Sequence, residues 1–457
     1  MQSPYRRATT NNSININFIE AIALSATLAA CGGSGGSSDT GNILTETETE
    51  TETETETETE TETGAGANAD LSNWIINTND RSTVIFESSV SSQGVLEDVQ
   101  LAEEKTIDAV NYVYIEATGI PHYDILITED MVDSLNSRPR ATTTDFPAGV
   151  TSAMTGQTIV FGEDIGYNSS SENCSTTGGT GYWPPGPGCP IGVAKTEYLP
   201  AEPTPGNTEC EAGLGTTGLM VNGTSIFGWG DGMSYGNNIW YNLAPVAEQY
   251  DVDICGGHAA QGEYHHHFYT SCLADLVGDN ATDHSPIYGY SADGYPLYGP
   301  YESNGVLAIS GWSTRDYGAA VSAGGCGTPE QRSCILLDEY DISQGVDTTV
   351  AAGPDIGDAV TTLSGNSLAA DDGYYLEDYY YAGATATGAQ LDQHNGHDNN
   401  DNRGYHYHIT LTETAGKLSP SFPYTMGPRF YGELSDNAPT SCGGAQIGGG
   451  LPGGGPP

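Results

Sequence analysis

Two segments of the chain follow one template of glycine, histidine and tyrosine. Each reads Gly-His, a short gap containing a glycine, and then Tyr-His-x-His; they are GHAAQGEYHHH from Gly257 and GHDNNDNRGYHYH from Gly396. Side chains alternate between the two faces of a β-strand, so a strand over each Tyr-His-x-His places two imidazoles on one face. The β-branched ITLT after the second segment favours a strand. We therefore expect a structural repeat in which two equivalent strands meet at one site.

The other histidines support a metal site. Nine of the 10 histidines lie between His258 and His408, and only His122 lies outside. Clustered imidazoles suit zinc, copper, nickel or iron. We predict that the paired faces converge on one centre, supplying up to four imidazoles, with Asp392 or the tyrosines orienting the rings. The predicted ligands are His258, His265, His267, His394, His397, His406 and His408, and copper or zinc is the expected metal.

Other interpretations of these segments stay open. Tyr-His strands can simply be well-packed polar strands, and a histidine can act as a general base without a metal. The stretch HYHITLTE places Glu413 after His-x-His, as in part of the first cupin motif, which leaves a metal-dependent, oxidoreductase-like enzyme as an alternative. The aromatic run YGYSADGYPLYGPY allows a ligand- or carbohydrate-binding surface. The oxygen-rich DNNDNRG from Asp398 is a weak calcium signal, because it departs from the EF-hand spacing.

Charge excludes some classes of partner. The chain has 457 residues and a formal net charge of -48, with 60 acidic and 12 basic side chains. So few Lys and Arg argue against nucleic-acid binding and against electrostatic attachment to an anionic membrane.

The N-terminus resembles a bacterial lipoprotein signal sequence. Leu28-Ala29-Ala30-Cys31 follows a short apolar run that is too short to span a bilayer. It resembles a bacterial lipobox, which implies a signal peptide over 1–30 and lipidation of Cys31. Residues 31–69 are then a disordered linker, because the Thr-Glu repeat contains no apolar side chains to bury. Repulsion between its glutamates should keep this linker extended. We expect a cell-envelope protein, lipid-anchored at the outer membrane or cell surface.

The cysteines indicate an oxidising compartment. Removing Cys31 from the 9 cysteines leaves an even number, for which four disulfides is the simplest hypothesis. Cys255 and Cys272 bracket the first histidine segment, and Cys326 and Cys334 lie close together. We predict one mainly β, disulfide-rich antiparallel domain with long loops over residues 70–443, with a hairpin turn at Asp293-Gly294, and a Gly/Pro-rich tail over 444–457.

Several blocks of the sequence occur together in one known family. They are GIPHYDI, VNGTSIFGW, CGGHAAQGEYHHHFYTSCL, PIYGYSADGYPLYGPY, LDQHNGHDNNDNRGYHYH and FPYTMG. In this order they resemble the YHYH domain family over most of Leu71 to Gly432, with the motif itself at Tyr405-His406-Tyr407-His408 and His266 replacing the second tyrosine in the first segment. The resemblance implies an exported domain, frequently on lipoproteins, and implies no particular reaction. We expect a surface-anchored lipoprotein that binds or handles a metal; whether it is also an enzyme stays open.

Overall fold

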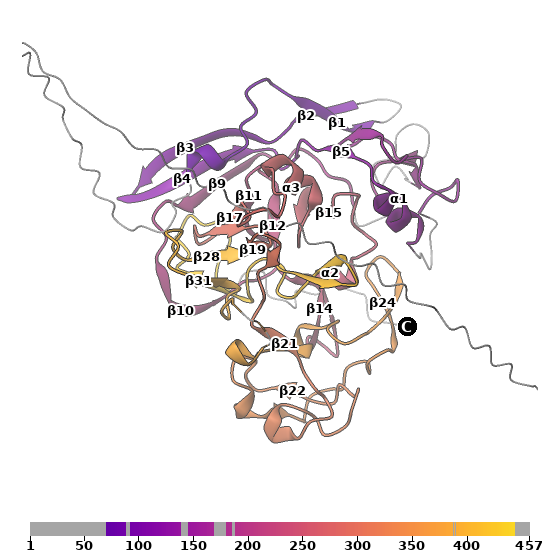
Figure 1. The fold of residues 1–457 in the computed structure, drawn as a ribbon, viewed down its shortest axis with the longest axis vertical. Coiled ribbons are helices and arrows are strands. Elements are labelled where there is room, and N and C mark those ends of the chain that lie inside the picture. The colour runs from indigo at the N-terminus through magenta and orange to yellow at the C-terminus, as the bar shows by residue number, and fades with distance from the viewer. Residues whose placement is uncertain are drawn as a thin grey trace, which may run out of the picture. The chain divides into compact units, whose positions relative to one another are not determined.

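A computed structural model describes residues 70–87, 92–138, 145–168, 180–184, 188–386, 388 and 390–443 (Figure 1). The predicted signal peptide, Cys31, the linker and the C-terminal tail lie outside the described residues. The structure is mainly β, as predicted, but it contains several sheets where one antiparallel domain was expected. Frequent glycines and prolines end most strands after a few residues, so small hairpins replace long strands.

The central sheet has eight strands in the order β15-β16-β12-β11-β17-β18-β28-β27. Its strands are β11 Thr216–Met220, β12 Ser225–Phe227, β15 Gly257–Ala260, β16 Glu263–His266, β17 Ile287–Ser291, β18 Pro296–Tyr298, β27 Gly396–His397 and β28 His406–His408. Two of its pairings, β12 with β16 and β18 with β28, are parallel, which corrects the expectation of a purely antiparallel fold. The predicted Asp293-Gly294 turn joins β17 to β18.

The remaining elements surround this sheet. A three-stranded sheet contains β3 Val99–Ile107, β4 Val110–Ala117 and β9 Lys195–Pro200. The two-stranded pairs are β1 Ser82–Glu87 with β2 Ser92–Leu96, β5 Asp124–Leu126 with β6 Thr158–Val160, β7 Tyr167–Asn168 with β8 Thr180–Gly181, β10 Pro205–Glu211 with β31 Arg429–Gly432, β13 Gly230–Tyr235 with β14 Trp240–Leu243, β19 Tyr301–Ser303 with β20 Val306–Leu307, β21 Trp312–Thr314 with β26 Tyr379–Tyr381, β22 Ile335–Leu336 with β23 Val346–Asp347, β24 Ala359–Thr361 with β25 Ser367–Ala369, and β29 Leu411–Thr414 with β30 Lys417–Pro420. The helices are α1 Glu129–Asn136, α2 Ala244–Ala247 and α3 Ser271–Val277, with short 3-10 turns η1 Leu71–Asn73, η2 Val321–Ala323, η3 Ile342–Gln344, η4 Leu376–Asp378 and η5 Gly383–Thr385.

The expected repeat is present in the central sheet. Each half is built from two hairpins, β11-β12 with β15-β16 and β17-β18 with β27-β28, and the halves meet where β11 pairs with β17. The register there is symmetric, because Gly218 pairs with Ser291 and Met220 pairs with Gly289, on either side of the pair Leu219 and Tyr290. The hairpins GLMVNGTSIFG from Gly218 and GYSADGYPLYG from Gly289 carry glycines at the same three positions. The sheet therefore has an approximate internal two-fold axis.

Glycine is required on both sides of this axis. A Cβ on Gly218 would lie 2.3 Å from the Tyr290 carbonyl oxygen, and a Cβ on Gly289 would lie 2.4 Å from the Leu219 carbonyl oxygen. We expect Gly218→Ala or Gly289→Ala to destabilise the fold by about 1–3 kcal/mol, because two backbones must move apart. Urea denaturation measures this. Gly94→Ala is the control, since its Cβ would meet only a Thr83 oxygen at 3.9 Å; an equal loss of stability in the control would contradict the explanation.

Disulfides hold several of the loops. The structure contains the disulfides Cys255–Cys272, Cys326–Cys334 and Cys210–Cys442, and Cys189 is also disulfide-bonded. The first closes the segment that carries the first histidine template. Disulfide content is therefore as the sequence indicated.

Residues between β20 and β27 form a lower lobe with a core of its own (Figure 1). Tyr317, Leu368, Tyr374 and Tyr375 pack there with Trp240.

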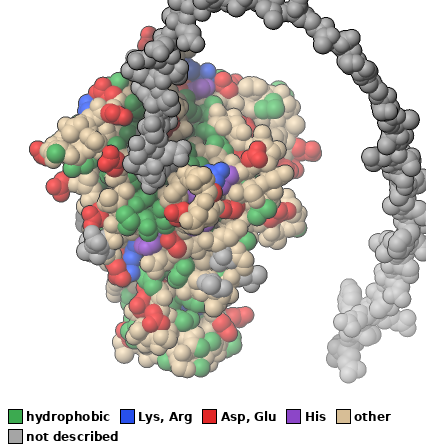
Figure 2. All heavy atoms as spheres, turned by 60° about the vertical axis from the view of Figure 1, so that its left-hand side comes forward, with side chains coloured by type: hydrophobic (Ala, Val, Ile, Leu, Met, Phe, Trp, Pro, Cys, Tyr) green, Lys and Arg blue, Asp and Glu red, His purple; other side chains and the backbone are tan. Residues whose placement is uncertain are grey.

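Among the described residues, no helix is long and apolar enough to cross a bilayer. Figure 2 shows acidic side chains scattered over the visible face, with few Lys and Arg among them.

Candidate metal centres

The hairpin of β15 and β16 builds the first histidine cluster. Cross-strand pairing sets His258 opposite His265, with ring centroids 4.6 Å apart. His265 and His267 point to the same side, with centroids 4.8 Å apart. His266 points to the other face, where its ring lies beside those of Tyr123 and Tyr264. Alternation along the strand thus brings His258, His265 and His267 together, and they are buried.

A glutamate completes this first cluster. Glu248, the C-cap residue of α2, places Oε2 3.4 Å from the Nε2 atoms of both His258 and His267. The Nε2 atoms of His265 and His267 are 3.1 Å apart. The first cluster therefore consists of three imidazoles and one carboxylate, His258, His265, His267 and Glu248.

The hairpin of β27 and β28 repeats this arrangement at the other edge of the sheet. His397 pairs with His406, just as His258 pairs with His265, and His408 takes the place of His267. Glu302 in β19 lies with its Oε2 3.2 Å from His397 Nε2 and 3.3 Å from His408 Nε2. His284 adds a further imidazole, whose ring lies 5.5 Å from that of His406 and 5.0 Å from that of His408. The second cluster is formed by two triads that share His408: His284 with His406 and His408, and Glu302 with His397 and His408.

Backbone carbonyls fix the tautomers of the ring nitrogens. A carbonyl only accepts, so each Nδ1 that contacts one must carry the proton and each Nε2 must present a lone pair. The Nδ1 of His267 donates to the Gly228 oxygen at 2.6 Å, and the Nδ1 of His408 donates to the equivalent Gly299 oxygen at 2.8 Å. The same bond holds four further rings: His258 to Asp251, His265 to Glu263, His284 to Ser285 and His406 to Gly404.

Several of the atoms that face the cluster centres, most of them in the second cluster, lack hydrogen-bond partners. The Nε2 atoms of His265 and His267 face each other across 3.1 Å, and Glu248 Oε2 lies 3.4 Å from the Nε2 atoms of His258 and His267. The buried, unpartnered atoms are Oε2 of Glu248 and Glu302, and Nε2 of His284, His397, His406 and His408. Buried polar atoms without partners are costly, and several acceptors that converge on one point are an arrangement that a cation could satisfy.

Burial keeps the imidazoles neutral. Desolvation lowers the pKa of His258 to about 4, of His267 to about 3 and of His406 to about 4. The pKa values of His265 and His408 also fall well below the ordinary value, first through burial and then through neighbouring imidazoles. Burial raises the pKa of Glu248 well above its ordinary value. Neutral imidazole is the form that binds a metal ion.

The distances within the clusters fit a transition metal. Metal-to-ligand bonds of about 2.0–2.1 Å in a tetrahedral zinc site place neighbouring ligand atoms about 3.3–3.4 Å apart. The separations from Glu248 and Glu302 to their histidines, 3.2–3.4 Å, match this value. The residues present therefore fit a zinc-like ion held by imidazole and carboxylate.

The prediction of one shared centre is wrong. Four strands, β12, β11, β17 and β18, separate β16 from β28 in the sheet. With about 4.8 Å between neighbouring strands, the two His-x-His pairs lie on the order of 24 Å apart. The repeat was recognised correctly, but its two copies are related by the central axis and so occupy opposite edges.

Some predicted residues lie outside both clusters. His394 donates from Nδ1 to the Arg429 carbonyl oxygen and packs against Tyr431, and it belongs to neither histidine cluster. Asp392 accepts the Tyr405 hydroxyl and backbone amides, and it orients no imidazole. Tyr264 donates to Asp253 in the same way. The template tyrosines therefore form hydrogen bonds on the opposite face of the sheet and do not orient the clustered imidazoles.

The structure also bears on the alternative interpretations. Glu413 is exposed on β29, which begins at Leu411 and is separate from β28, which ends at His408, so Glu413 does not join the histidines as the cupin-like interpretation requires. Tyr288, Tyr290, Tyr295 and Tyr298 are buried, so four of the five tyrosines of this aromatic run pack inside the protein, and Tyr301 is partly exposed. In the oxygen-rich loop, Asp398 accepts the Asn400 amide and Asp401 pairs with Arg403.

Sequence reasoning missed three members of the clusters. Glu248 and Glu302 lie far from the template, and His284 stands alone in the sequence. The sequence repeat could have indicated Glu302. Glu302 lies three residues after Gly299, and in the other half an acidic residue, Asp231, lies three residues after the equivalent Gly228. In the first half Asp231 accepts from Met233 and Asn242, and Glu248 from α2 takes the position beside the histidines.

His122, outside both clusters, provides a pH-dependent contact. Its Nδ1 lies 2.7 Å from Asp98 Oδ2, and this hydrogen bond raises its pKa above the ordinary value despite partial burial. A raised pKa contributes stability below pH about 6.5, and this contribution is lost as pH rises through the folded-state pKa. NMR titration should give His122 a pKa above about 6.5 in the wild type and a lower one in Asp98→Asn; equal values would contradict this role.

Comparison with known proteins gives one match. A family model described as "YHYH protein" matches residues 196–417, which spans both clusters and all strands of the central sheet. No curated protein matches the chain, and no solved structure matches it.

Proposed function

Since the chain belongs to the YHYH family through residues 196–417, we propose that it is a metal-binding protein with two transition-metal centres, one in each half of the repeat. The first cluster would bind one ion through His258, His265, His267 and Glu248. The second would bind another through Glu302, His397 and His408, with His406 and His284, which form a triad with the same His408, as further ligands. Zinc or copper is the metal that such imidazole and carboxylate sets favour.

The single observation that carries this proposal is the convergence of unpartnered acceptors. Five buried nitrogen and oxygen atoms of the second cluster, and Glu248 Oε2 of the first, lack hydrogen-bond partners, and backbone carbonyls accept from Nδ1 of His284, His406 and His408, which leaves the Nε2 lone pairs facing inward. Hydrogen-bonded polar strands, the alternative interpretation, would pair these atoms with donors. One cation in each cluster would supply the partner that these atoms lack.

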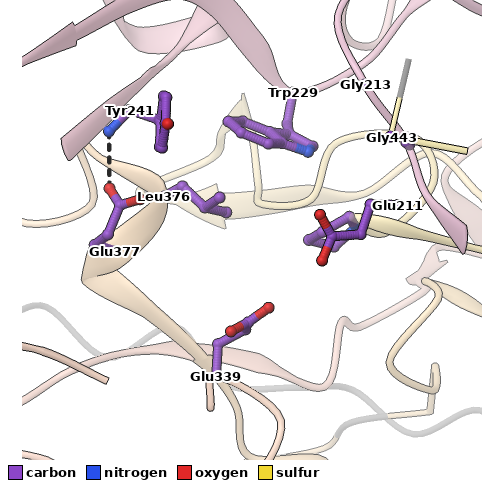
Figure 3. A pocket seen from close by; sticks show the side chains of 10 residues that line it. Glu211, Gly213, Trp229, Tyr241, Glu339, Leu376, Glu377 and Gly443 are labelled. Atoms are coloured by element: carbon purple, nitrogen blue, oxygen red, sulfur yellow. Dashed lines mark hydrogen bonds between the residues drawn. The ribbon is translucent and has the colours of Figure 1, made fainter. Parts of the chain in front are cut away.

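The arrangement favours metal binding over catalysis. Catalytic zinc sites keep one coordination position open, whereas structural sites fill all four positions with protein ligands. The first cluster offers three buried imidazoles and the Glu248 carboxylate beside two of them. The pocket shown in Figure 3 is lined by residues that belong to neither histidine cluster, so it does not provide a substrate site beside the proposed metal ions. We propose a role in binding or handling metal outside the cytoplasm.

The same proposal includes an exported lipoprotein anchored through Cys31. It is supported by the lipobox-like sequence and by disulfides, which persist in oxidising compartments. Labelling of expressing bacteria with a fatty-acid probe tests it: wild type should be labelled and Cys31→Ser should not. Equal labelling of both would reject this anchor and leave the metal proposal standing.

Elemental analysis of protein purified without a His tag tests the metal centres. We expect about two ions per chain, about one in the double variant His265→Ala/His267→Ala, and about one in His406→Ala/His408→Ala. His266→Gln and His394→Gln are the matched controls, because these histidines neighbour the clusters but point elsewhere. Retention of both ions in either double variant, or no metal in the wild type after zinc and copper loading, would reject the proposal.

A further inference from the structure

A pocket of about 230 Å³ lies apart from both histidine clusters. Residues from distant parts of the chain line it: Glu211 at the end of β10, Trp229 after β12, Tyr241 in β14, Glu339 after β22, and Leu376 and Glu377 in η4. The lower lobe contributes the last three and the region around the central sheet contributes the others. Pockets between such units are common sites for small molecules.

Three carboxylates surround this pocket. In Figure 3 the carboxylates of Glu211, Glu339 and Glu377 lie around one opening, with the Trp229 indole on the facing side. Glu377 accepts the Tyr241 amide at 2.8 Å, and burial raises its pKa to about 8 and raises that of Glu339. Glu211 is more exposed, and Arg429 lies 3.6 Å from it. A cation placed beside these carboxyl groups favours their ionised form, so the inner part of the pocket suits a cation or hydrogen-bond donors better than an anion.

A second observation points to a ligand. Trp229 is only 5% exposed, and its indole Nε1 is a buried donor without a hydrogen-bond partner. Figure 3 shows the nitrogen-bearing edge of the ring turned toward the side of the pocket where Glu211 lies. An indole N–H is a donor only, so a complementary ligand must carry an acceptor oxygen as well as a positive charge. The face of the Trp229 ring suits an adjacent cation.

We infer that this pocket binds a small protonated amine that also carries hydroxyl groups, such as an amino sugar or amino alcohol. The ammonium group lies between Glu339 and Glu377, a hydroxyl oxygen accepts from Trp229 Nε1, and the apolar side of the ligand packs on Trp229 and Leu376. A carboxylate or phosphate group is disfavoured, because it would lie beside three glutamates in a pocket whose lining, among the residues that the structure describes, contains no Lys or Arg. The pocket is smaller than those that hold drug-sized ligands, which limits the ligand to about one sugar ring.

Isothermal titration of the full chain with glucosamine tests this inference, with N-acetylglucosamine as the matched neutral probe. We expect one glucosamine per chain and at least about tenfold weaker binding of the neutral sugar. Glu339→Gln and Glu377→Gln should each weaken glucosamine binding about tenfold, since the charge is lost while the side-chain shape is retained. Trp229→Phe should also weaken binding, because it removes only the N–H donor and part of the ring.

Exposed Glu413 provides the control, and Glu413→Gln should bind glucosamine as the wild type does. Each variant is first compared with the wild type in thermal unfolding and metal content, so that a loss of binding is assigned to the pocket. Equal affinity for the two sugars, no binding of glucosamine, or unchanged binding in both Glu339→Gln and Glu377→Gln would overturn the inference.

Discussion

Stripping the metal is expected to lower the thermal unfolding midpoint of the protein by about 10 °C or more. A ligand held a thousandfold above its dissociation constant stabilises a folded protein by about 4 kcal/mol, and two centres contribute twice. In the stripped protein, Glu248 and Glu302 each keep a buried oxygen without a partner. These atoms must then take up protons or admit water, and either change weakens the sheet edges.

Calorimetry of the wild type before and after chelation measures this effect. Readdition of zinc or copper should restore the midpoint, whereas magnesium should not, because magnesium prefers an octahedral shell of oxygen ligands. His406→Ala/His408→Ala should show a smaller shift on chelation than the wild type, since one centre is already lost. An unchanged midpoint after complete removal of metal would contradict a structural role for the two ions.

Arg332→Ala is expected to cost about 3–5 kcal/mol of unfolding free energy, because it leaves a buried carboxylate unpaired. The side chains of Arg332 and Asp378 are both 0% exposed, and two hydrogen bonds of 2.7 Å join them. Arg332 also donates to the carbonyls of Pro354, Ala370 and Asp371. This one guanidinium therefore joins several loops of the lower lobe that contain little regular structure.

Urea denaturation checks the prediction, and Lys105→Ala is its control. Lys105 pairs with Glu103 at 3.1 Å, but both side chains are about a third or more exposed, so this loss should stay below about 1 kcal/mol. The Arg332 variant should also lose the pocket, because η4 contains both Asp378 and Glu377, while the first cluster keeps its metal. Similar free-energy losses in the two variants would contradict the importance of the buried pair.

The local parts of this fold follow from the sequence. Alternation predicts that His265 and His267 share a face and that His266 and Tyr264 lie opposite, and the structure agrees. The repeat is also visible in the sequence, because the segments that begin at Gly218 and Gly289 carry glycines at the same three positions. The strand order is not local, because it depends on how β11 meets β17, and the glycines that permit this close approach do not indicate which strands become neighbours.

The ligand sets show the same division. Histidines could be selected because imidazoles on alternate strand positions have a shared direction. Glu248 and Glu302 could not be distinguished among 60 acidic residues, because only tertiary structure brings a C-cap of α2 and a short strand β19 to the cluster centres. His394 was included on sequence proximity alone, and its backbone turns the ring toward Arg429 instead.

Anomalous X-ray scattering from crystals of the metal-loaded protein, recorded at the zinc and copper absorption edges, tests the central claim most directly. Two peaks per chain are predicted, one about 2.0–2.1 Å from the Nε2 atoms of His258, His265 and His267, and one at the same distance from those of His397 and His408. Density for water or for protonated, hydrogen-bonded side chains at both positions, with no anomalous signal, would contradict it.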